Sequence, residues 1–548
     1  MVEKPFAISL EVGSSLANHT GSWRIQRPEY VNRMPPCNNA CPAGENIQNW
    51  LYIAEDGSYQ KAWEAIIEQN PFPAIMGRVC YHPCQNVCNR AELDEAVGIN
   101  SVERFLGDLA IKKNWTIPIN QISSGRKILV IGAGPAGLSA AYHLRRLGHE
   151  VVIREATHAL GGMMRFGIPK YRLPREVLDA EINRLADIGI KFELNSKVED
   201  LKAALLERFD AIFLAIGAQL SKRAYIPAGE AARILDAINV LHDIEEGEKP
   251  LLGRRVIVYG GGNTAMDVAR SAKRLGAESA IIVYRRTREK APANDGEISE
   301  ALEEGVLIKW LSTVKHVSNS SIQVEKMKLN ANGFPEPTGE FEELAADSLV
   351  LALGQEVDLA ILKNCKEIEV DDGVIQVGDN MMTNISGVFA GGDMIPDERT
   401  VTTGIGHGKK AARHIDAWLR SDSYCKVKND DVVKFEELNT WYYSDAPHAV
   451  RPRLEASRRA SNFDEIVTGL NEETALYEAR RCMSCGNCFE CDNCFGVCPD
   501  NAIIKLGPGK GFEINLDYCK GCGICVTECP SSSILMISEK TSSNNSRK

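Results

Sequence analysis

The 548-residue sequence lacks the features of a membrane or secreted protein. It has no uninterrupted apolar run of roughly 18 residues, so we expect no transmembrane helix. Its start, MVEKPFAISL, has neither a basic segment nor a sustained apolar segment, so we expect no secretory signal. These absences favour a cytoplasmic protein, in a compartment where disulfides rarely persist.

The sequence also has fewer basic than acidic residues. The sequence has 63 Lys and Arg against 74 Asp and Glu, a net charge of −11. A nucleic-acid-binding function is therefore disfavoured, because it needs a basic surface to neutralise phosphates. Its 44% hydrophobic and 25% charged residues are ordinary for a globular protein, and the length allows about three to four domains.

Nucleophilic and acid–base constellations are missing as well. The 10 histidines form no metal-ligand pairing with the cysteines, and no nucleophile lies in a recognisable arrangement with a base. We therefore assign no catalytic residue. Such an absence is compatible with redox chemistry, in which bound cofactors rather than side chains carry the reaction.

Cysteine, by contrast, is abundant, with 17 residues. In a reducing compartment, clustered cysteines indicate metal or redox chemistry. Five lie near the N-terminus and ten lie between residues 482 and 529. Cys365 and Cys425 stand alone, and we interpret them as structural residues.

The C-terminal cysteines contain two C-x2-C-x2-C-x3-C-P runs, the spacing of bacterial two-cluster ferredoxins. In that pattern the fourth cysteine of each run ligates the other cluster. A pair of zinc sites is disfavoured, because zinc sites are usually built from two separated C-x2-C pairs. The predicted ligands of the first cluster are Cys488, Cys491, Cys494 and Cys529. The predicted ligands of the second cluster are Cys519, Cys522, Cys525 and Cys498.

Two further cysteines, Cys482 and Cys485, precede these runs in the sequence RRCMSCGNC. They exceed the eight ligands that two clusters need. We favour a purely structural role for them, and an alternative register that uses them as ligands remains open.

The N-terminal cysteines occur in PPCNNACPAG and GRVCYHPCQNVC. They are too many for one [4Fe–4S] cluster and too few for two. A zinc site is the alternative, although spacings made only of x3 gaps fit zinc poorly. We predict one cluster here, and three [4Fe–4S] clusters in the whole chain, with candidate ligands among Cys37, Cys41, Cys80, Cys84 and Cys88.

A first phosphate-binding turn lies in GRKILVIGAGPAGLSAAYHLRRLGHEVVIREA. A continuous apolar strand, a G-x-G-x-x-G turn, a helix and a second strand follow one another, which is the dinucleotide-binding context. Glu155 ends the second strand and is placed to accept hydrogen bonds from a ribose. The turn residues are Gly132, Gly134, Pro135, Ala136 and Gly137.

A second such turn lies in RRVIVYGGGNTAMDVARSAKRLGAESAIIVYRR, with the pattern G-x-G-x-x-A. The strand after its helix ends in Arg285 and Arg286 instead of an acid. Arginines at this place can bind the 2′-phosphate of NADP, so we favour NADP(H) over NAD(H) and leave both open. The candidate residues of this turn are Gly260, Gly261, Gly262, Asn263, Thr264 and Asp267.

Two dinucleotide folds in one chain predict FAD on the first and NAD(P) on the second. A returning segment for FAD is ISGVFAGGD, a strand that ends at Gly392 and Asp393. The helix opening after it, with Gly404 and Ile405, can stabilise negative charge on the flavin ring. His407 is the one histidine close enough in sequence to this site to be of interest.

Over about residues 30 to 420, these motifs resemble the small chain of glutamate synthase and its relatives. The matching stretches include GRVCYHPCQNVC, VIGAGPAGLSAA, GGMMRFGIPKYRLP, GGGNTAMDVAR, YRRTREKAPA and GVFAGGD. The resemblance implies an α/β fold of two Rossmann-like domains, for FAD and NAD(P), in a disulfide-reductase-like arrangement. An N-terminal helical iron–sulfur domain would precede it, and a C-terminal ferredoxin-like α+β domain would follow. Further cofactor contacts implied by the resemblance are Gly162, Arg172, Gly217 and Gly354.

The chain departs from that family at its N-terminus. Glutamate synthase small chains carry a C-x2-C pair upstream, and WRIQRPEYVNRMPP has none. The resemblance therefore implies only one complete N-terminal cluster, on Cys41, Cys80 and Cys84. Its fourth ligand is either the carboxylate of Glu103 or a thiolate of Cys37 or Cys88. If Glu103 is the ligand, these two cysteines would be remnants of a lost cluster, and Glu103 as a plain surface residue is also left open.

The second departure is the appended ferredoxin segment. It resembles the tails of the NAD-linked subunit of phenylglyoxylate-type 2-oxoacid dehydrogenases and of the NAD(P)H:acceptor oxidoreductase of the dissimilatory sulfite reductase pathway. The resemblance implies an electron-transfer subunit that serves a partner chain, most simply a 2-oxoacid oxidoreductase. The alternatives are a free-standing NAD(P)H:ferredoxin-type oxidoreductase, a glutamate synthase small chain, and a non-catalytic scaffold, which the intact glycine turns disfavour.

The motifs divide the chain into domains. Residues 1–120 form the helical iron–sulfur domain, residues 121–245 and 376–420 the FAD domain, and residues 246–375 the NAD(P) domain. Residues 421–475 are a connector, residues 476–540 the ferredoxin domain and residues 541–548 a disordered tail.

Overall fold

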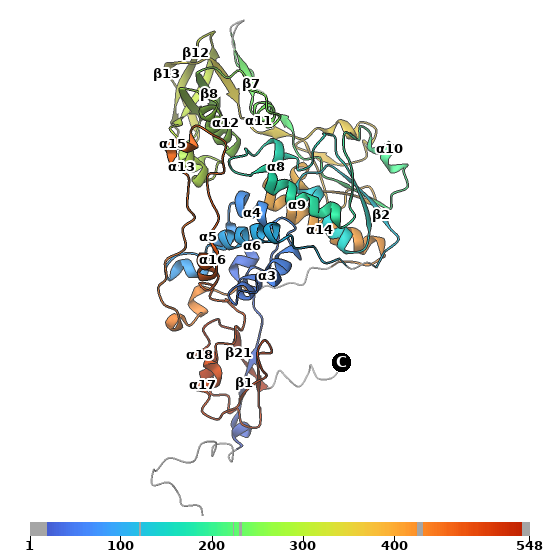
Figure 1. The fold of residues 1–548 in the computed structure, drawn as a ribbon, viewed down its shortest axis with the longest axis vertical. Coiled ribbons are helices and arrows are strands. Elements are labelled where there is room, and N and C mark those ends of the chain that lie inside the picture. Colours follow the sequence, from blue (N-terminus) through green and yellow to red (C-terminus); the bar gives the residue numbers. More distant parts are fainter. Residues whose placement is uncertain (1–18, 120–121, 223, 229–232, 425–430, 540–548) are drawn as a thin grey trace, which may run out of the picture.

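The computed structural model describes residues 19–119, 122–222, 224–228, 233–424 and 431–539. The molecule is elongated: two α/β units lie side by side at one end, a helical unit lies in the middle, and a small cysteine-rich unit lies at the other end (Figure 1). Cys425 and the predicted tail 541–548 lie outside the described residues. Among the described residues, no helix is both long and apolar enough to cross a membrane.

The first α/β unit is built on a parallel five-stranded sheet in the order β18-β5-β2-β3-β4. The central strand β2 is almost wholly buried, as its apolar run KILVI predicts. Helices α7 and α14 pack closely on each other because Gly408 of α14 approaches the backbone of α7. The strands are β2 (Lys127–Ile131), β3 (Glu150–Arg154), β4 (Lys191–Glu193), β5 (Ala211–Leu214) and β18 (Val388–Ala390), and the helices are α7 (Pro135–Arg146), α8 (Met163–Phe166), α9 (Arg175–Asp187), α10 (Leu201–Leu205) and α14 (Val401–Leu419).

The second α/β unit repeats this plan with the strand order β10-β9-β8-β14-β7. An antiparallel sheet of three longer strands lies against it. The parallel strands are β7 (Ile234–Asp236), β8 (Arg255–Tyr259), β9 (Ser279–Val283), β10 (Leu307–Lys309) and β14 (Ser348–Leu351). The antiparallel strands are β11 (Ser312–Val317), β12 (Ser321–Leu329) and β13 (Pro335–Ala345), and the helices are α11 (Ala237–Glu245), α12 (Asn263–Arg274) and α13 (Asp295–Glu303).

The expected boundaries of this unit need correction. β7 hydrogen-bonds to β14, and α11 packs on α12, so the unit begins before residue 246. After β14 the chain pairs β15 (Gln355–Glu356) with β6 (Leu220–Ser221), and these two strands carry the crossings between the units. Ile361 and Leu362 are then buried in the core of the first unit, so the chain returns to it before residue 376. The residue composition does not change where the chain passes from one unit to the other, because both units consist of alternating strands and helices. The sequence therefore did not locate these boundaries.

The helical unit surrounds one core and includes a helix from the far end of the chain. Leu470, Ala475 and Ala479 are buried in that core. The expected start of the ferredoxin domain at residue 476 therefore falls inside a helix, α16 (Glu472–Ala479), that belongs to the helical unit. The other helices are α1 (Pro36–Ala40), α2 (Ile47–Ala54), α3 (Tyr59–Ile67), α4 (Pro73–Val79), α5 (Pro83–Asn86) and α6 (Ile99–Lys113).

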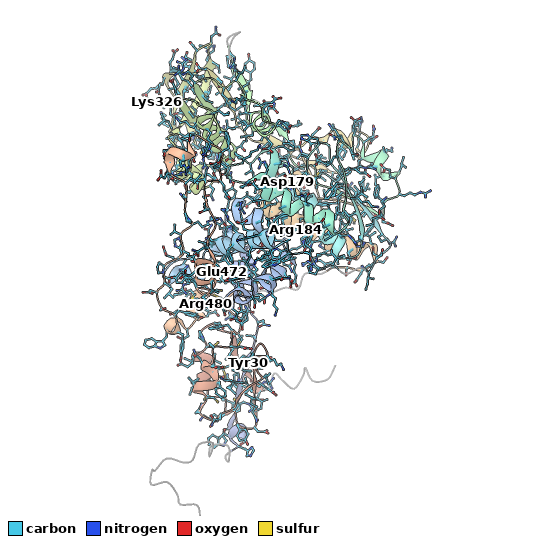
Figure 2. The ribbon with its side chains drawn as sticks, viewed as in Figure 1. Tyr30, Asp179, Arg184, Lys326, Glu472 and Arg480 are labelled. Carbon is cyan, nitrogen blue, oxygen red and sulfur yellow. The ribbon has the colours of Figure 1, made fainter. Side chains whose placement is uncertain are left out.

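The small unit at the other end combines segments from the two ends of the described chain. β1 (Gln26–Tyr30) pairs antiparallel with β21 (Ile534–Ser538), so residues from the expected N-terminal domain complete the ferredoxin-like fold. The stick view places Tyr30 in this unit, while Glu472, the first residue of α16, and Arg480, which follows this helix, lie in the helical unit (Figure 2). The remaining elements are α17 (Asn493–Val497), α18 (Ile524–Thr527), β19 (Ile503–Lys505) and β20 (Phe512–Ile514).

Residues 431–471 make specific contacts with other parts of the molecule. Ile466 N donates to Tyr171 O in the first α/β unit. In α15 (Ala456–Arg459), Arg459 Nη1 lies 2.9 Å from Glu303 Oε2 of the second unit. The segment expected to be a simple connector therefore contacts both α/β units.

Candidate functional site

A cavity of about 1270 Å³ lies between the two α/β units and is lined by both glycine-rich turns. Parallel sheets bring the carboxyl ends of their strands to one edge, which is where dinucleotides bind. The predicted residues that line it are Gly132, Gly134, Pro135, Ala136, Glu155, Gly162, Arg172, Gly217, Gly260, Gly261, Gly262, Asn263, Thr264, Asp267, Arg285, Arg286, Gly354, Gly392, Asp393 and Gly404.

Two predicted cofactor residues do not belong to this lining. A Cβ on Gly137 would collide with Gly132 O, so this glycine permits the close packing of α7 on the turn. The Ile405 side chain is fully buried, and its carbonyl accepts a hydrogen bond from Ser139 Oγ at 2.7 Å. Both residues hold the helices that carry the site.

The first turn offers a cradle that a ligand can approach. Gly134 caps α7, and a Cβ built on it would meet no atom within 4 Å. The helix N-terminus beside this open space presents free backbone N–H groups and the positive end of its dipole. Pyrophosphate is the chemistry that such a cradle fits.

Glu155 fastens the end of β3 to this turn. One carboxylate oxygen accepts from Ala133 N at 2.8 Å, and the other accepts from Thr157 N at 2.9 Å. The side chain is buried and still lines the cavity. A fixed carboxylate at this place fits the hydroxyl groups of a ribose.

The returning segment closes the first site. Asp393 lies in the cavity wall, and burial raises the pKa of its carboxyl. Gly392 N donates to His407 Nδ1 at 3.2 Å, and His407 Nε2 lies 2.9 Å from Asp397 Oδ2. His407 therefore positions the loop that presents Asp393. The first residues of α14 border the cavity from the same side.

The second turn is held from behind by aromatic and amide contacts. A Cβ on Gly261 would collide with the ring of Tyr284. Asn263 Oδ1 accepts from Asn294 N at 2.9 Å, which ties the start of α12 to the loop before α13. Arg285 and Arg286 follow β9 in the cavity wall, and their guanidinium groups fit a phosphate ester.

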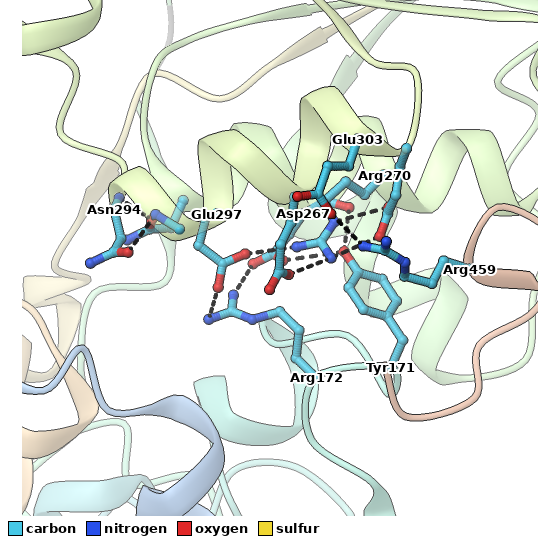
Figure 3. Close-up of polar contacts among 12 residues, drawn as sticks. Tyr171, Arg172, Asp267, Arg270, Asn294, Glu297, Glu303 and Arg459 are labelled. Atoms are coloured by element: carbon cyan, nitrogen blue, oxygen red, sulfur yellow. Dashed lines mark hydrogen bonds and ion pairs between the residues drawn. The ribbon is translucent and has the colours of Figure 1, made fainter. Parts of the chain in front are cut away.

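Two predicted cofactor residues pair with each other. Arg172 Nη1 lies 2.8 Å from Asp267 Oδ2, and Arg172 Nη2 lies 2.7 Å from Glu297 Oε1. Arg270 Nη1 in turn lies 2.8 Å from Glu297 Oε2, and Figure 3 shows the resulting network together with Tyr171 and Arg459. Each charge is compensated by another, so these residues join the two units at the cavity wall.

The helical unit reaches the same cavity. Val79 and Tyr81 line it, and Cys80 lies between them in sequence. Thr402 Oγ1, at the start of α14, donates to Cys80 Sγ at 3.3 Å. One N-terminal cysteine is thus hydrogen-bonded to the helix that borders the expected flavin position.

Cys41, Cys80 and Cys84 are electrostatic neighbours of one another and of two buried carboxyl groups. Asn70 Nδ2 donates to Glu45 Oε1 at 2.9 Å and to Glu103 Oε1 at 3.0 Å. Burial raises the pKa of Glu103 well above its ordinary value, and the charge of Glu45 adds to this.

Glu103 is 5% exposed, so the alternative of a plain surface residue is wrong. Three thiols beside a buried carboxyl form a donor set that fits an iron–sulfur cluster.

The ferredoxin-like unit has two small hollows, each lined by one of the two predicted ligand sets. One hollow is lined by Cys488, Cys491, Cys494 and Cys529. The other is lined by Cys498, Cys519, Cys522 and Cys525. In each hollow, three thiols come from one run and one from the other, which is the crossed arrangement that the spacing predicts.

Cys482 and Cys485 lie apart from these two sets. They follow α16 and are electrostatic neighbours of Cys37 and Cys88. Within the described ranges, no three or more His, Cys, Asp or Glu side chains are grouped to hold a single metal ion. The thiolates of a cubane cluster bind different irons and therefore surround a larger group than one ion.

Comparison with known proteins assigns the domains. Residues 126–414 match the family model described as pyridine nucleotide-disulphide oxidoreductase. The chain belongs to this family. Residues 30–115 match dihydropyrimidine dehydrogenase domain II, 4Fe-4S cluster, and residues 487–533 match the 4Fe-4S dicluster domain.

Several curated proteins are similar over most of the chain. The NADP(+)-dependent formate dehydrogenase subunit beta of Moorella thermoacetica is 34% identical, over 82% of this chain and 70% of its own. The NADPH-Fe(3+) oxidoreductase subunit beta of Geobacter sulfurreducens is 30% identical, over 84% and 77%. The glutamate synthase [NADPH] small chain of Escherichia coli is 31% identical, over 70% and 89%.

These matches confirm the predicted fold class and the resemblance to glutamate synthase small chains. The chain is an NAD(P)H-dependent flavin oxidoreductase of this family that carries iron–sulfur domains at both ends. Two of these relatives are named as beta subunits, one of an NADP(+)-dependent formate dehydrogenase and one of an NADPH-Fe(3+) oxidoreductase.

Proposed function

We propose that this chain exchanges a hydride with NADP(H) at the cavity between its α/β units and single electrons with a separate oxidoreductase chain. The observation that carries this proposal is the shared cavity. Both glycine-rich turns and two residues of the cysteine-bearing helical unit line the same space. A hydride donor and an electron outlet can therefore meet there.

The cofactors supply the chemistry when they are bound: FAD takes a hydride and releases electrons singly, and iron–sulfur clusters carry one electron at a time. In the forward direction NADPH becomes NADP⁺, and its hydride carries two electrons and one proton. The two electrons reduce the acceptor in two single steps, and the proton is released to solvent. Run backwards, the same balance reduces NADP⁺.

The chain's own side chains bind and orient. Glu155 and Asp393 would hold the ribose and ribityl hydroxyls of FAD, and Gly134 would admit its pyrophosphate. Around the second turn, Gly262 would admit the pyrophosphate of the nicotinamide nucleotide, while Arg285 and Arg286 would bind a 2′-phosphate. The names of the relatives, which specify NADP(+) and NADPH, favour the same nucleotide.

Three clusters follow from the ligand sets described so far. Two would occupy the hollows of the ferredoxin-like unit. A third would be held by Cys41, Cys80 and Cys84, next to the cavity. The exposure of Cys491 and Cys522 favours the ferredoxin-like end as the exit to a partner.

The partner class predicted from the sequence is a 2-oxoacid oxidoreductase. A formate-oxidising chain is the second candidate, because the relative at 34% identity is named as a formate dehydrogenase subunit. Both candidates place the substrate on another polypeptide, in keeping with the lack of an acid–base constellation here.

Anaerobic reductive titration tests the electron-transfer function. The purified holoprotein is mixed with NADPH or NADH while the flavin and iron–sulfur absorbance are recorded. We expect flavin bleaching, then cluster reduction, with NADPH the more effective donor. A flavin that stays oxidised with both nucleotides, yet is reduced by dithionite, would overturn the proposal and favour a scaffold.

Anaerobic purification from the native host tests the partner. A stoichiometric thiamine-dependent chain would support the 2-oxoacid class, and a formate-oxidising chain would support the second candidate. Elution of the holoprotein alone would contradict the subunit proposal and favour a free-standing oxidoreductase with a diffusible acceptor.

A further inference from the structure

Four cysteines without a function so far lie together where the helical unit meets the ferredoxin-like unit. Cys37 is in α1, Cys88 follows α5, and Cys482 and Cys485 follow α16. Cys37, Cys88 and Cys482 pack against the same helical core. About 400 residues of sequence separate the first pair from the second, so only the fold brings them together.

Hydrogen bonds connect the two segments that carry these cysteines. Asn89, next to Cys88, donates from Nδ2 to Cys485 Sγ at 3.6 Å. Ser484 lies between Cys482 and Cys485 in the sequence, and its Oγ accepts a buried hydrogen bond from Gln48 Nε2 at 3.2 Å.

The same glutamine is tied to the first cysteine. Its backbone N–H donates to Asn38 Oδ1 at 3.1 Å, and Cys37 Sγ lies 3.7 Å from that oxygen. The contact from Asn89 Nδ2 to Cys485 Sγ is of the kind that iron–sulfur ligands commonly receive from their surroundings.

The electrostatic surroundings agree with this geometry. Cys482, Cys88 and Cys485 are all electrostatic neighbours of Cys37. Cys88 is likewise a neighbour of both Cys482 and Cys485. Four thiolates this close together would repel one another unless metal ions compensated their charge.

We propose that Cys37, Cys88, Cys482 and Cys485 ligate a fourth [4Fe–4S] cluster, whose ligands come from the two ends of the chain. The C-x2-C pair that the N-terminus lacks is thus supplied by RRCMSCGNC, beside α16. In this assignment a ligand role replaces the structural role predicted for Cys482 and Cys485, and it replaces both alternatives for Cys37 and Cys88, as remnants or as a fourth ligand of the other cluster.

This assignment also leaves Glu103 as the fourth ligand of the other helical cluster. Cys37 and Cys88, the two thiols that competed for that role, are both engaged. Glu103 and Glu45 are both buried carboxyl groups that neighbour Cys41 and Cys84, and of the two only Glu103 was a candidate ligand from the sequence.

The new site lies between the other clusters. Cys84, from the site near the cavity, is a neighbour of Cys37. On the other side, Tyr443 has Cys482 and Cys485 together with the ferredoxin ligands Cys491 and Cys529 among its neighbours. The Tyr443 hydroxyl donates to Met483 O at 3.0 Å. The fourth cluster would therefore join the helical cluster to the ferredoxin pair.

The conducting role rests on the electron-transfer function proposed above, but the existence of the cluster does not. Iron, zinc and acid-labile sulfide are measured per FAD in the full-length holoprotein after removal of loosely bound metal. Four clusters predict about 16 iron and 16 sulfide, and three predict about 12. About 12 iron, with or without a stoichiometric zinc, would overturn the proposal whatever the NADPH titration shows.

Variants locate the cluster. The double variant Cys482→Ser/Cys485→Ser should lose about four iron and about a quarter of the dithionite-reduced EPR spin count. Cys365→Ser, in the core of the first α/β unit, is the matched control and should keep the wild-type count. An unchanged count in the double variant would refute the assignment.

If the double variant loses FAD as well, it has misfolded, and Cys37→Ser takes its place. Since this ligand comes from the other end of the chain, the same EPR component should change in line shape or disappear. An unaltered spectrum there, or a wild-type iron count of about 12, decides against the proposal.

Discussion

Arg172 and Asp267, one from each α/β unit, form a buried ion pair with Nη1 and Oδ2 separated by 2.8 Å. Glu297 completes the arrangement from α13 at 2.7 Å. Arg172 and Asp267 also line the large cavity, so the contact that joins the two α/β units forms part of the cavity wall. The relative orientation of the two units and the shape of the site are therefore coupled.

Removal of Arg172 should destabilise the protein. Arg172→Met leaves the buried Asp267 carboxylate without its counter-charge, at a cost of about 3–5 kcal/mol, while Glu297 keeps its ion pair with Arg270. Thermal unfolding followed by circular dichroism should show a clearly lower midpoint. Arg254→Met is the control, because its ion pair with Glu278 is exposed and should contribute no more than about 1 kcal/mol. Equal midpoints for the two variants would contradict a structural role for the buried pair.

Nucleotide preference should depend on Arg285 and Arg286. Hydrogen bonds to a charged group contribute about 1.5–3 kcal/mol, so Arg285→Ala/Arg286→Ala should lower kcat/KM for NADPH roughly 10- to 150-fold. The value for NADH should change little, since NADH lacks the 2′-phosphate. Arg288→Ala serves as the control, because this arginine pairs with Asp295 at 3.4 Å. A preference that survives both substitutions would mean that other residues read the nucleotide.

The two buried carboxyl groups near Cys41 should behave differently. Glu103→Ala removes the proposed fourth ligand, and we expect the EPR signal of that cluster to change to a three-iron type or vanish. Glu45→Gln keeps the hydrogen-bonding shape of a carboxyl that accepts from Trp50 and Asn70, and it should retain the signal. The reverse pattern would identify Glu45 as the ligand.

Tyr30 should tune the potential of a ferredoxin cluster. Its hydroxyl lies 3.2 Å from Cys494 Sγ, and hydrogen bonds to ligand sulfur favour the reduced state. Tyr30→Phe removes about 1 kcal/mol of this stabilisation, equivalent to a shift of about 40 mV toward negative potential. Redox titration monitored by EPR measures it. Tyr477→Phe, which loses only a bond to Pro447 O, should leave the potential where it was.

Glu181 should make stability depend on pH near neutrality. Its carboxyl is fully buried and caps α4 through Ala74 N at 3.1 Å and Ile75 N at 3.0 Å. Burial raises its pKa from 4.5 to about 7. Because the folded state holds the proton more tightly, its contribution is complete below about pH 4.5 and is lost as the pH rises to about 7.

The slope of this loss is at most about 1.4 kcal/mol per pH unit. Glu181→Gln imitates the protonated carboxyl, so its unfolding midpoint should vary less between pH 5 and 7.5 than that of the wild type. The exposed Glu369→Gln is expected to follow the wild-type curve. Parallel curves for all three proteins would exclude Glu181 as the source.

The sequence by itself determined the parts whose chemistry is contiguous. Gly132 to Glu155 contains a whole strand–turn–helix–strand unit, so its turn and its acid are fixed by local spacing. The ferredoxin runs are equally local: three thiols within seven residues converge on one hollow, and the crossed fourth ligand follows from the repeat.

Only the tertiary structure decided what depends on distant segments. The pairing of β1 with β21 spans about 500 residues. The meeting of Cys37 with Cys482 depends on α16 packing into the helical core. Arg172 could bind a cofactor phosphate or pair with Asp267, since both partners carry negative charge. Residue spacing alone could not predict which of the two partners it has. The burial of apolar helix faces brings these distant segments into contact. This burial depends on the packing of surfaces from the whole fold, and no single stretch of sequence contains those surfaces.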